Sequence, residues 1–415
     1  MNISNINNNN NVDNPNCLDE VCYSTLAILV INFLDSYVYK MMIGLMWLSL
    51  VFFGVLGNGL VIFIAISYKK LNDITNCYIF NLAITDLLFV LFCIPFTTYI
   101  YLFDNWFFGI TFCKLNHFMS HASVQSTCLT LTAMTIHRCN LIIKNKAMTH
   151  HIARIKRRQK TVLLITICIW IVSFLVSSPD LIYYTVTEQN YESSNETIKA
   201  CSFDETTYSI FKSYISISHI VSIATTYVIP LLVIVLSYTR LLSHLSKNQR
   251  RLAKFSRDDD KKNIHKKKSL LSNLNEENDT RRYSSSAQGA KCLNNNKSKK
   301  IKKSENRKKK VTTMVAVVTL NFGICWLPTH LFIILKTTLG DSNPQLLPYL
   351  SLFKLFAHTL SYLTPVINPC LYAFYNENFR SCFYDLWFRM TCKSNKANMN
   401  SKNNLAIRSN SKSVF

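Results

Sequence analysis

The sequence predicts an all-α fold, a seven-transmembrane helix bundle followed by a short amphipathic eighth helix. Nearly half of the 415 residues are hydrophobic, and they gather into long blocks with the charged residues between them. An α-helix needs roughly 20 apolar residues to cross a bilayer, and seven blocks of this length occur. The blocks also lack the strict polar–apolar alternation of barrel strands, so we expect helices.

The expected spans follow one another along most of the chain, at 41–66, 76–102, 110–142, 162–186, 212–243, 311–337 and 347–374. They form a bundle over 41–375, which an outer amino-terminal segment over 1–40 precedes. An amphipathic helix over 376–391 and a tail over 392–415 follow the bundle.

The distribution of charge predicts the orientation of the bundle. The formal net charge is +23, and the loop from Lys247 to Lys310 alone holds 22 Lys or Arg against 7 Asp or Glu. This loop is polar and nearly free of aromatic residues, so we expect the segment 247–310 to be disordered. Short loops on the same side are also basic, which places the amino terminus outside and this loop in the cytoplasm. Basic segments beside spans attract anionic membrane lipids rather than nucleic acid.

Several residues in the loops or at the ends of the spans are candidates for covalent modification. Asn2 and Asn195 lie in glycosylation sequons on the outer side. Cys113 and Cys201 both face that oxidising side, where a disulfide is expected to persist. Cys392 follows the amphipathic helix and is a candidate for palmitoylation.

Polar residues within the spans predict a functional interior. A carboxylate in a membrane helix costs several kcal/mol unless it faces a wet interior, and Asp86 in the second span is the clearest case. A single such residue is explained by hydrogen bonding between helices. Because polar residues and prolines are spread over most of the spans, we expect a hydrated network with a carboxylate that binds a cation.

Short motifs occur in order along the helices: Gly57-Asn58, Leu82-Ala83 with Asp86, Trp106 with Gly109 and Cys113, Trp170, Pro230 with Tyr238, Phe322 with Cys325-Trp326-Leu327-Pro328, and Asn368-Pro369-Cys370-Leu371-Tyr372. Over about 41–390 the chain therefore resembles the rhodopsin-like class of G-protein-coupled receptors. Residues 123–134 look like the third helix of kisspeptin receptors, and 92–97 are similar to galanin and allatostatin receptors.

The resemblance implies a plasma-membrane receptor for an extracellular, amidated neuropeptide. Heterotrimeric G proteins, arrestin and receptor kinases are the implied partners. The kisspeptin likeness implies coupling to Gq and the galanin likeness coupling to Gi/o, and the sequence does not choose between them. The alternatives are a receptor of this class for a non-peptide ligand, a constitutively active receptor and, less in keeping with the motifs, a transporter.

The resemblance also implies roles for residues of the interior. A sodium ion, with no other cofactor, would act as an allosteric modulator bound by Asp86, Thr127 and Asn368. Arg138 would meet the G protein. The residues expected to change position on activation are Arg138, Phe322, Trp326, Pro230, Tyr238, Asn368, Pro369 and Tyr372.

One position departs from the family pattern. Most of the family has an acidic residue before the arginine, which holds it in the resting state by a charge-assisted hydrogen bond, whereas this chain has His137-Arg138-Cys139. Lys308 stands where some relatives have a second acid. We therefore expect a resting state that is held less firmly and a raised basal signal.

The ligand site is bounded by what its helices lack. The outer half of the third span has no Asp to bind an amine, and Tyr362 stands where opsins carry the retinal lysine. The predicted mouth is polar and aromatic, with the candidate ligand contacts His117, His121, Gln125, Glu205, His330, His358 and Tyr362. Three outer acids, Asp104, Asp204 and Glu205, are positioned to meet a basic peptide.

The rival classes lack their own sequence features. A transporter is expected to show internal repeats or charge pairs at mid-membrane, and we find neither. An enzyme is expected to carry a metal-ligand or nucleophile motif such as HExxH or GxSxG, and the sequence has none.

Overall fold

The structure is a computed structural model of the chain. It describes residues 30–389 except for 31, 35, 69–70, 72, 144–151, 191–196, 204–213, 215–216, 248–249, 251–283, 340–345 and 378. Within the helices, the side chains of 152–158 and 284–309 are not described. The predicted sites Asn2, Asn195, Glu205 and Cys392 therefore lie outside the described residues, as does the tail 392–415.

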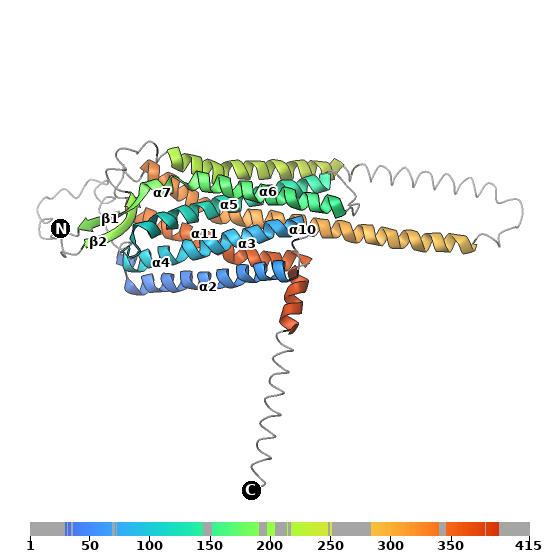
Figure 1. Cartoon of the computed structure of the whole chain (residues 1–415), viewed down its shortest axis with the longest axis horizontal. Helices are drawn as coiled ribbons and strands as arrows, with labels where there is room; N and C mark the ends of the chain where they lie inside the picture. Colours follow the sequence, from blue (N-terminus) through green and yellow to red (C-terminus); the bar gives the residue numbers. More distant parts are fainter. Residues whose placement is uncertain are drawn as a thin grey trace, which may run out of the picture.

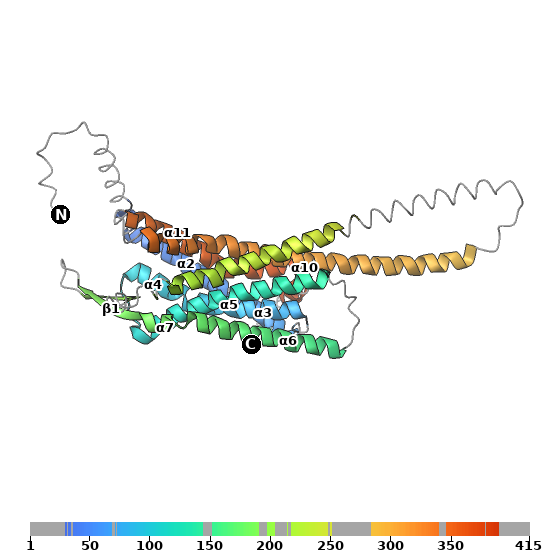
Figure 2. The same cartoon turned by 90° about the horizontal axis from the view of Figure 1, so that it is seen from above.

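The helices run side by side in one elongated bundle (Figures 1 and 2). The elements are α2 (Tyr37–Ser67), α3 (Ile74–Phe92), α4 (Ile94–Phe103), α5 (Gly109–Ile143), α6 (Ile152–Ser177), α7 (Asp180–Tyr183), β1 (Tyr184–Asn190), β2 (Thr197–Phe203), η3 (Ala224–Val228), α10 (Ser284–Leu339) and α11 (Leu347–Tyr375). The π-helix η3 lies within a helical span, Ile217–Lys247, which we call the fifth helix. The predicted seven-helix bundle is confirmed.

Prolines determine where two of the spans are interrupted. The second span is divided into α3 and α4 at Cys93, two residues before Pro95, because a proline has no N–H and its ring displaces the carbonyl of the preceding turn. In the fifth helix, the N–H of Ile229 donates to the carbonyl of Ala224 and closes a π turn immediately before Pro230. A π-bulge of this kind accommodates the missing donor within a continuous helix.

The fourth span ends earlier than the sequence predicts. The prediction continued to residue 186, whereas α6 ends at Ser177 and strand β1 begins at Tyr184. The physical reason is Pro179, which disfavours the helical conformation for the residue before it. The short helix α7 follows this turn and starts with Asp180.

Helix α5 lies at the centre of the bundle, in contact with α3, α6, α10, η3 and β1. Six of the described helices are long and apolar enough to cross a membrane, and α5 is not one of them. Its buried side chains include Ser123, Gln125 and Thr130. Helix α2 shows the opposite pattern, since Leu45 and Phe52 are exposed on its outer face. Protein rather than lipid therefore covers most of α5, and its polar residues bond within the bundle.

A β-hairpin covers one end of the bundle, which we call the disulfide end (Figure 1). Strands β1 and β2 pair antiparallel, with Val186 opposite Cys201. The predicted disulfide between Cys113 and Cys201 is present. The N–H of Trp106 donates to the carbonyl of Lys199 at 2.7 Å. The start of α5 and the hairpin are thus tied together at two points.

At the opposite end, α10 extends well beyond the bundle (Figure 2). It begins at Ser284, inside the segment 247–310 that the sequence predicts to be disordered, so that prediction does not hold from Ser284 onward. Lysine, arginine, glutamine and glutamate favour the helix, and the span below supplies a nucleus from which it propagates. The first proline in α10 is Pro328.

A short helix follows α11 at 377 and 379–389, where the sequence predicts an amphipathic helix over 376–391. It turns away from the bundle axis (Figure 1). Phe379 and Cys382 are buried, whereas Tyr384 and Trp387 are exposed. This helix therefore presents one face to the bundle and leaves aromatic residues on its outer face.

Candidate functional site

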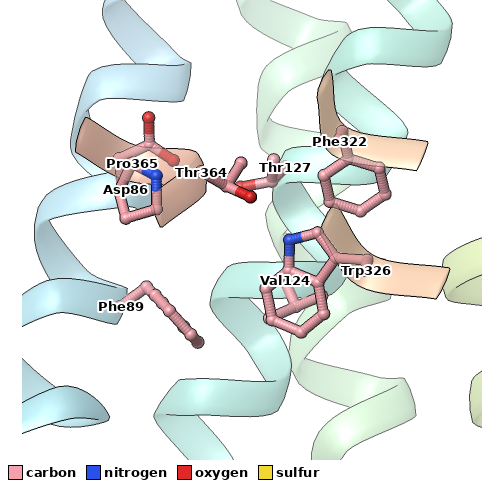
Figure 3. A pocket seen from close by; sticks show the side chains of 8 residues that line it. All are labelled: Asp86, Phe89, Val124, Thr127, Phe322, Trp326, Thr364 and Pro365. Atoms are coloured by element: carbon pink, nitrogen blue, oxygen red, sulfur yellow. The ribbon is translucent and has the colours of Figure 1, made fainter. Parts of the chain in front are cut away.

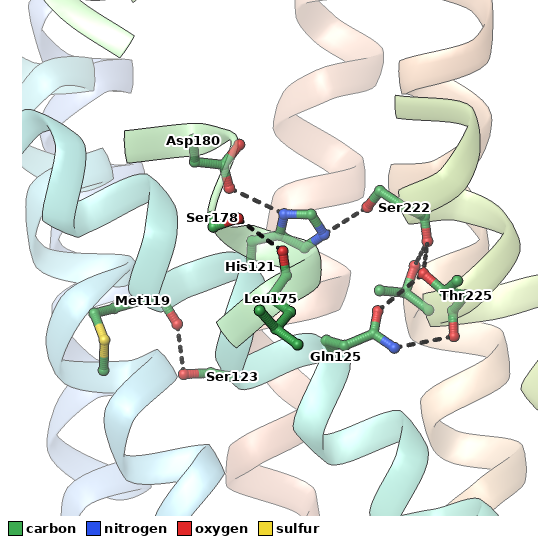
Figure 4. A network of polar contacts seen from close by, with 10 residues as sticks. Met119, His121, Ser123, Gln125, Leu175, Ser178, Asp180, Ser222 and Thr225 are labelled. Atoms are coloured by element: carbon green, nitrogen blue, oxygen red, sulfur yellow. Dashed lines mark hydrogen bonds and ion pairs between the residues drawn. The ribbon is translucent and has the colours of Figure 1, made fainter. Parts of the chain in front are cut away.

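His121 joins three elements near the disulfide end. Its Nδ1 lies 3.0 Å from a carboxylate oxygen of Asp180 at the start of α7, and its Nε2 lies 2.6 Å from the hydroxyl of Ser222 in the fifth helix (Figure 4). A carboxylate only accepts, so Nδ1–H donates to Asp180, and Nε2 shares a hydrogen bond with the hydroxyl of Ser222. The side chain of His121 on α5 thereby links α7 to the fifth helix.

Gln125 lies one turn further into the bundle on the same helix (Figure 4). Its amide donates to the carbonyl of Thr225 at 3.2 Å and accepts from the hydroxyl of Thr225 at 3.2 Å. The side chain is fully buried. In this structure Gln125 therefore joins α5 to the fifth helix, and its role as a ligand contact stays a prediction.

His117 lies on α5 one turn before His121, closer to the disulfide end, and stacks on Tyr184 of β1. The two ring centroids are 3.5 Å apart and the planes differ by 5°. Burial raises the pKa of the Tyr184 hydroxyl, which keeps that ring neutral. The hairpin thus covers the predicted ligand residue His117 with an aromatic ring.

His330 of α10 is a buried imidazole with unused hydrogen-bonding capacity. The residue is 7% exposed, and its ring lies 4.6 Å from that of Tyr227. Both ring nitrogens are buried with no hydrogen-bond partner among the described residues. Each such buried polar atom costs about 1–3 kcal/mol, so a bound ligand that supplied a donor and an acceptor would be favoured here.

His358 and Tyr362 lie on the opposite side of the mouth. His358 lines a cavity of about 370 Å³ between α2, α4 and α11. The hydroxyl of Tyr362 is 3.3 Å from Nδ1 of His358, and its ring packs against Trp47 at 5.2 Å and Phe89 at 5.9 Å. Tyr362 is 2% exposed and lines neither this cavity nor the deeper one. Its contact with His358 therefore supports a residue of the cavity wall from behind.

A second, small cavity lies deeper in the bundle, beside Asp86 (Figure 3). Its volume is about 10 Å³, which is roughly the room for one water-sized particle. The side chains that line it come from α3, α5, α10 and α11: Asp86, Phe89, Val124, Thr127, Phe322, Trp326, Thr364 and Pro365. The cavity is therefore lined by carboxylate and hydroxyl oxygens on one side and by aromatic rings on the other, and it has room for one water molecule or small ion.

The residues predicted to bind sodium are close together but not all turned to this cavity. Asn368 donates to the carboxylate of Asp86 at 3.0 Å, and its own oxygen accepts from Asn321 at 3.4 Å. The hydroxyl of Thr127 donates to that of Thr85 at 2.9 Å. Asp86 and Thr127 line the cavity, whereas Asn368 contacts Asp86 from beside it.

Aromatic rings connect the ligand residues to this cavity. Trp326 stacks on Phe322 at 5.8 Å and meets Phe89 edge-on at 5.4 Å. His330 lies 6.3 Å from Trp326. The hydroxyl of Tyr227, three residues before Pro230, donates to the carbonyl of Gly323 at 2.8 Å. His330 is therefore connected through packed rings to Phe322 and to Phe89, which line the small cavity.

The two prolines of α11 leave a carbonyl that another helix uses. Pro369 has no N–H for the carbonyl of Pro365, four residues earlier, and the amide of Asn58 donates to that carbonyl at 2.8 Å. Tyr372 lies one turn further on and is fully buried, and its hydroxyl has no partner among the described residues. The proline segment of α11 is thus tied to α2 through Asn58.

At the end opposite the disulfide, Arg138 is close to an acid that the sequence analysis did not associate with it. Its Nη2 lies 4.0 Å from a carboxylate oxygen of Asp73. The same oxygen accepts from the N–H of Thr75 and caps α3. The predicted switch residue Tyr238 is half-buried in the fifth helix. An acid from the start of α3 therefore stands near Arg138, although His137 precedes it in the chain.

Comparison with known proteins agrees with this geometry. The family described as "7 transmembrane receptor (rhodopsin family)" matches residues 57–372. The chain belongs to this family. Among similar proteins are the KiSS-1 receptor of Homo sapiens, 28% identical over 82% of this chain and 73% of the relative, and the galanin receptor type 1 of Homo sapiens, 29% identical over 86% and 82%. The allatostatin-A receptor of Bombyx mori is 30% identical over 80% and 75%. The predicted resemblance to this receptor group is confirmed.

Two charged residues of the receptor were missed although the sequence carried a signal for them. Asp180 lies inside the predicted span 162–186, and Lys354 lies inside the predicted span 347–374. An ionisable residue in a span is a functional candidate by default, and this reasoning was applied to Asp86 alone. Nothing in the sequence marks Ser222 or Thr225, because ordinary hydroxyl residues are frequent in these helices.

Proposed function

We propose that this receptor binds an extracellular amidated neuropeptide and signals through heterotrimeric G proteins. The names of its relatives, which refer to KiSS-1, galanin and allatostatin-A, favour a peptide. The observation that carries the proposal is the buried imidazole of His330, whose two nitrogens have no hydrogen-bond partner among the described residues. A neutral imidazole has one donor and one acceptor on different sides of the ring, and a primary carboxamide both donates and accepts, so it can pair with either of them.

The test is a signalling assay in cells with calcium and cyclic-AMP reporters. A panel of amidated neuropeptides, each paired with its free-acid form, is applied beside amines and nucleotides. We expect the receptor to respond to an amidated peptide and the potency of the free-acid form to be at least about tenfold lower, since one hydrogen bond to a charged or buried group is worth about 1.5–3 kcal/mol.

Two variants identify the residues involved. His330→Phe keeps a ring of similar shape and is expected to bring the amide and the acid forms to similar potency. Arg138→Ala is expected to abolish signalling while surface expression persists. Silence of the surface-expressed receptor to every peptide, or a response to an amine alone, would overturn the proposal.

We also propose a sodium ion as an allosteric modulator at the cavity beside Asp86. The carboxylate of Asp86 and the hydroxyls of Thr127 and Thr364 line the same small space, and oxygen donors of this kind suit a hard cation. The oxygen of Asn368 accepts from Asn321, so Thr364 takes the place that the sequence analysis gave to Asn368. Bound sodium would favour whichever conformation binds it more tightly.

The orientation and the remaining partners complete the proposal. The basic loops favour an orientation with the Arg138 end in the cytoplasm and the disulfide end and amino terminus outside. Arrestin and receptor kinases would act at the Arg138 end, and the basic segments there would contact anionic lipid. An antibody to an amino-terminal tag should stain intact cells, and staining that requires permeabilisation would contradict this orientation.

A further inference from the structure

The cavity between α2, α4 and α11 lies at the disulfide end and has an unusual charge. Its volume of about 370 Å³ is within the range of pockets that hold small ligands or side chains. Both charged and apolar side chains line it, among them Lys40, Trp47, Asp104, Lys354, Leu355 and His358.

The charges of this cavity do not cancel. The ammonium of Lys40 donates to the carboxylate of Asp104 at 2.7 Å, which neutralises both groups. Lys354 is exposed to the cavity, and no carboxylate of the described residues lies within 4.0 Å of its ammonium group. The positive charge of Lys354 is therefore available to pair with an anionic group of a ligand.

The cavity also offers a surface that strengthens an ion pair. Trp47 and Leu355 are largely buried apolar walls beside Lys354, and charges attract more strongly where the surroundings are less polarisable than water. The same cavity holds His358, which is bonded to Tyr362 and so has a fixed orientation. The rings of Tyr362, Phe89 and Trp326 separate this cavity from His330.

From this arrangement we infer that the cavity is a second ligand subsite, which receives a carboxylate of the ligand against Lys354. The inference rests on the proposed peptide ligand and adds to it: the peptide would carry an Asp or Glu side chain as well as the carboxamide that His330 takes. Charge-assisted hydrogen bonds between ammonium and carboxylate are among the stronger polar contacts in proteins. Asp104, which the sequence analysis set against a basic peptide, is already paired with Lys40.

The first experiment measures potency on paired peptides and receptors. The probes are the activating peptide from the amidated panel and its variants in which each Asp or Glu is replaced by Asn or Gln. At one acidic position of the peptide, this replacement is expected to lower potency on the wild-type receptor by about 10- to 100-fold. On Lys354→Gln the original and the replaced peptide should be equally weak, and on Lys354→Glu the replaced peptide should be the better agonist. An activating peptide whose acidic residues are all dispensable would overturn the inference.

The second experiment needs no agonist, so the two proposals can fail separately. The purified full-length receptor is unfolded thermally with N-acetyl-glutamate amide or N-acetyl-glutamine amide as the probe. The acid should raise the Tm of the wild type and of the matched control Lys199→Gln, whose lysine pairs with Glu188 outside the cavity, but not that of Lys354→Gln. If the acid raises the Tm but no peptide activates the receptor, the anion subsite is supported and the peptide proposal is overturned. If a peptide activates the receptor but the acid does not raise the Tm and Lys354→Gln does not change potency, the peptide proposal is supported and the anion subsite is overturned.

Other occupants give different results. If Lys354→Gln lowers the Tm before any probe is added, the cavity already holds an anionic group of the chain itself. If a shift that depends on Lys354 occurs only when anionic phospholipid replaces phosphatidylcholine in nanodiscs, the occupant is a lipid headgroup. Either result would overturn the inference.

Discussion

Replacing Asp73 by Asn is expected to raise the basal signal of the receptor. Asp73 lies 4.0 Å from Arg138, and His137 takes the place of the acid that neighbours this arginine in most of the family. Asp73 therefore supplies from another helix the negative charge that the chain lacks next to Arg138. The change to Asn removes the charge and keeps a side-chain oxygen for the N–H of Thr75, since Asn is as good an N-cap as Asp.

The magnitude follows from distance and exposure. Two unit charges 4 Å apart attract by about 1 kcal/mol in water and about 4 kcal/mol at an effective dielectric constant of 20. The side chain of Asp73 is 48% exposed and that of Arg138 is 12% exposed, so solvent screening reduces the value to about 0.5–1 kcal/mol. This energy corresponds to a change of roughly two- to fivefold in the ratio of active to resting receptor.

The assay compares basal reporter signals at matched surface expression over a series of expression levels. Asp385→Asn is the matched control, because Asp385 is another carboxylate at this end that pairs with Arg389 and not with Arg138. Adding His137→Asp to Asp73→Asn should return the basal signal to the wild-type level or below it. Equal signals from the wild type and Asp73→Asn, or an equal rise in Asp385→Asn, would refute the reasoning.

Three further predictions concern the stability of the purified receptor. Sodium chloride, compared with choline chloride, should raise the Tm of the wild type and leave that of Asp86→Asn unchanged; equal shifts would exclude the cation site. Asn58→Ala leaves the carbonyl of Pro365 without its donor and should lower the free energy of unfolding by about 1–3 kcal/mol. In chemical denaturation, an unaltered midpoint would contradict that role. Cys113→Ser opens a disulfide between residues 88 positions apart and should cost about 3–5 kcal/mol, with a matching loss of surface expression. Cys168→Ser, at an exposed free cysteine, should show neither effect.

The fold was predictable because it depends on long segments. Each span is a run of apolar residues whose length matches the bilayer, and errors arose where a local break decided the boundary, as at Pro179. The disulfide was predictable because Cys113 at the outer start of the third span and Cys201 in the loop before the fifth both face the oxidising side. Asp86 was predictable because a lone carboxylate in an apolar span is conspicuous.

The pairings between distant residues were not predictable in the same way. His121 meets Asp180 and Ser222, which are 59 and 101 positions away, and Arg138 meets Asp73 from the start of another helix. Such contacts depend on how the helices are rotated and shifted against one another, and apolar periodicity does not specify either quantity. The sequence therefore identified polar residues as candidates without showing that Gln125 bonds to Thr225 within the protein.

The polar character of α5 bears on how the protein enters the membrane. Helices leave the translocation channel for lipid when they are sufficiently hydrophobic, and central polar side chains oppose that step. Helix α5 is not among the described helices that meet the requirement by composition, although its neighbours α2 and α3 do and precede it in synthesis. Insertion of α5 is thus expected to be cooperative, with α3 providing partners such as Asn81 for Thr130, so that loss of the Asn81 side chain is expected to lower the amount of inserted protein.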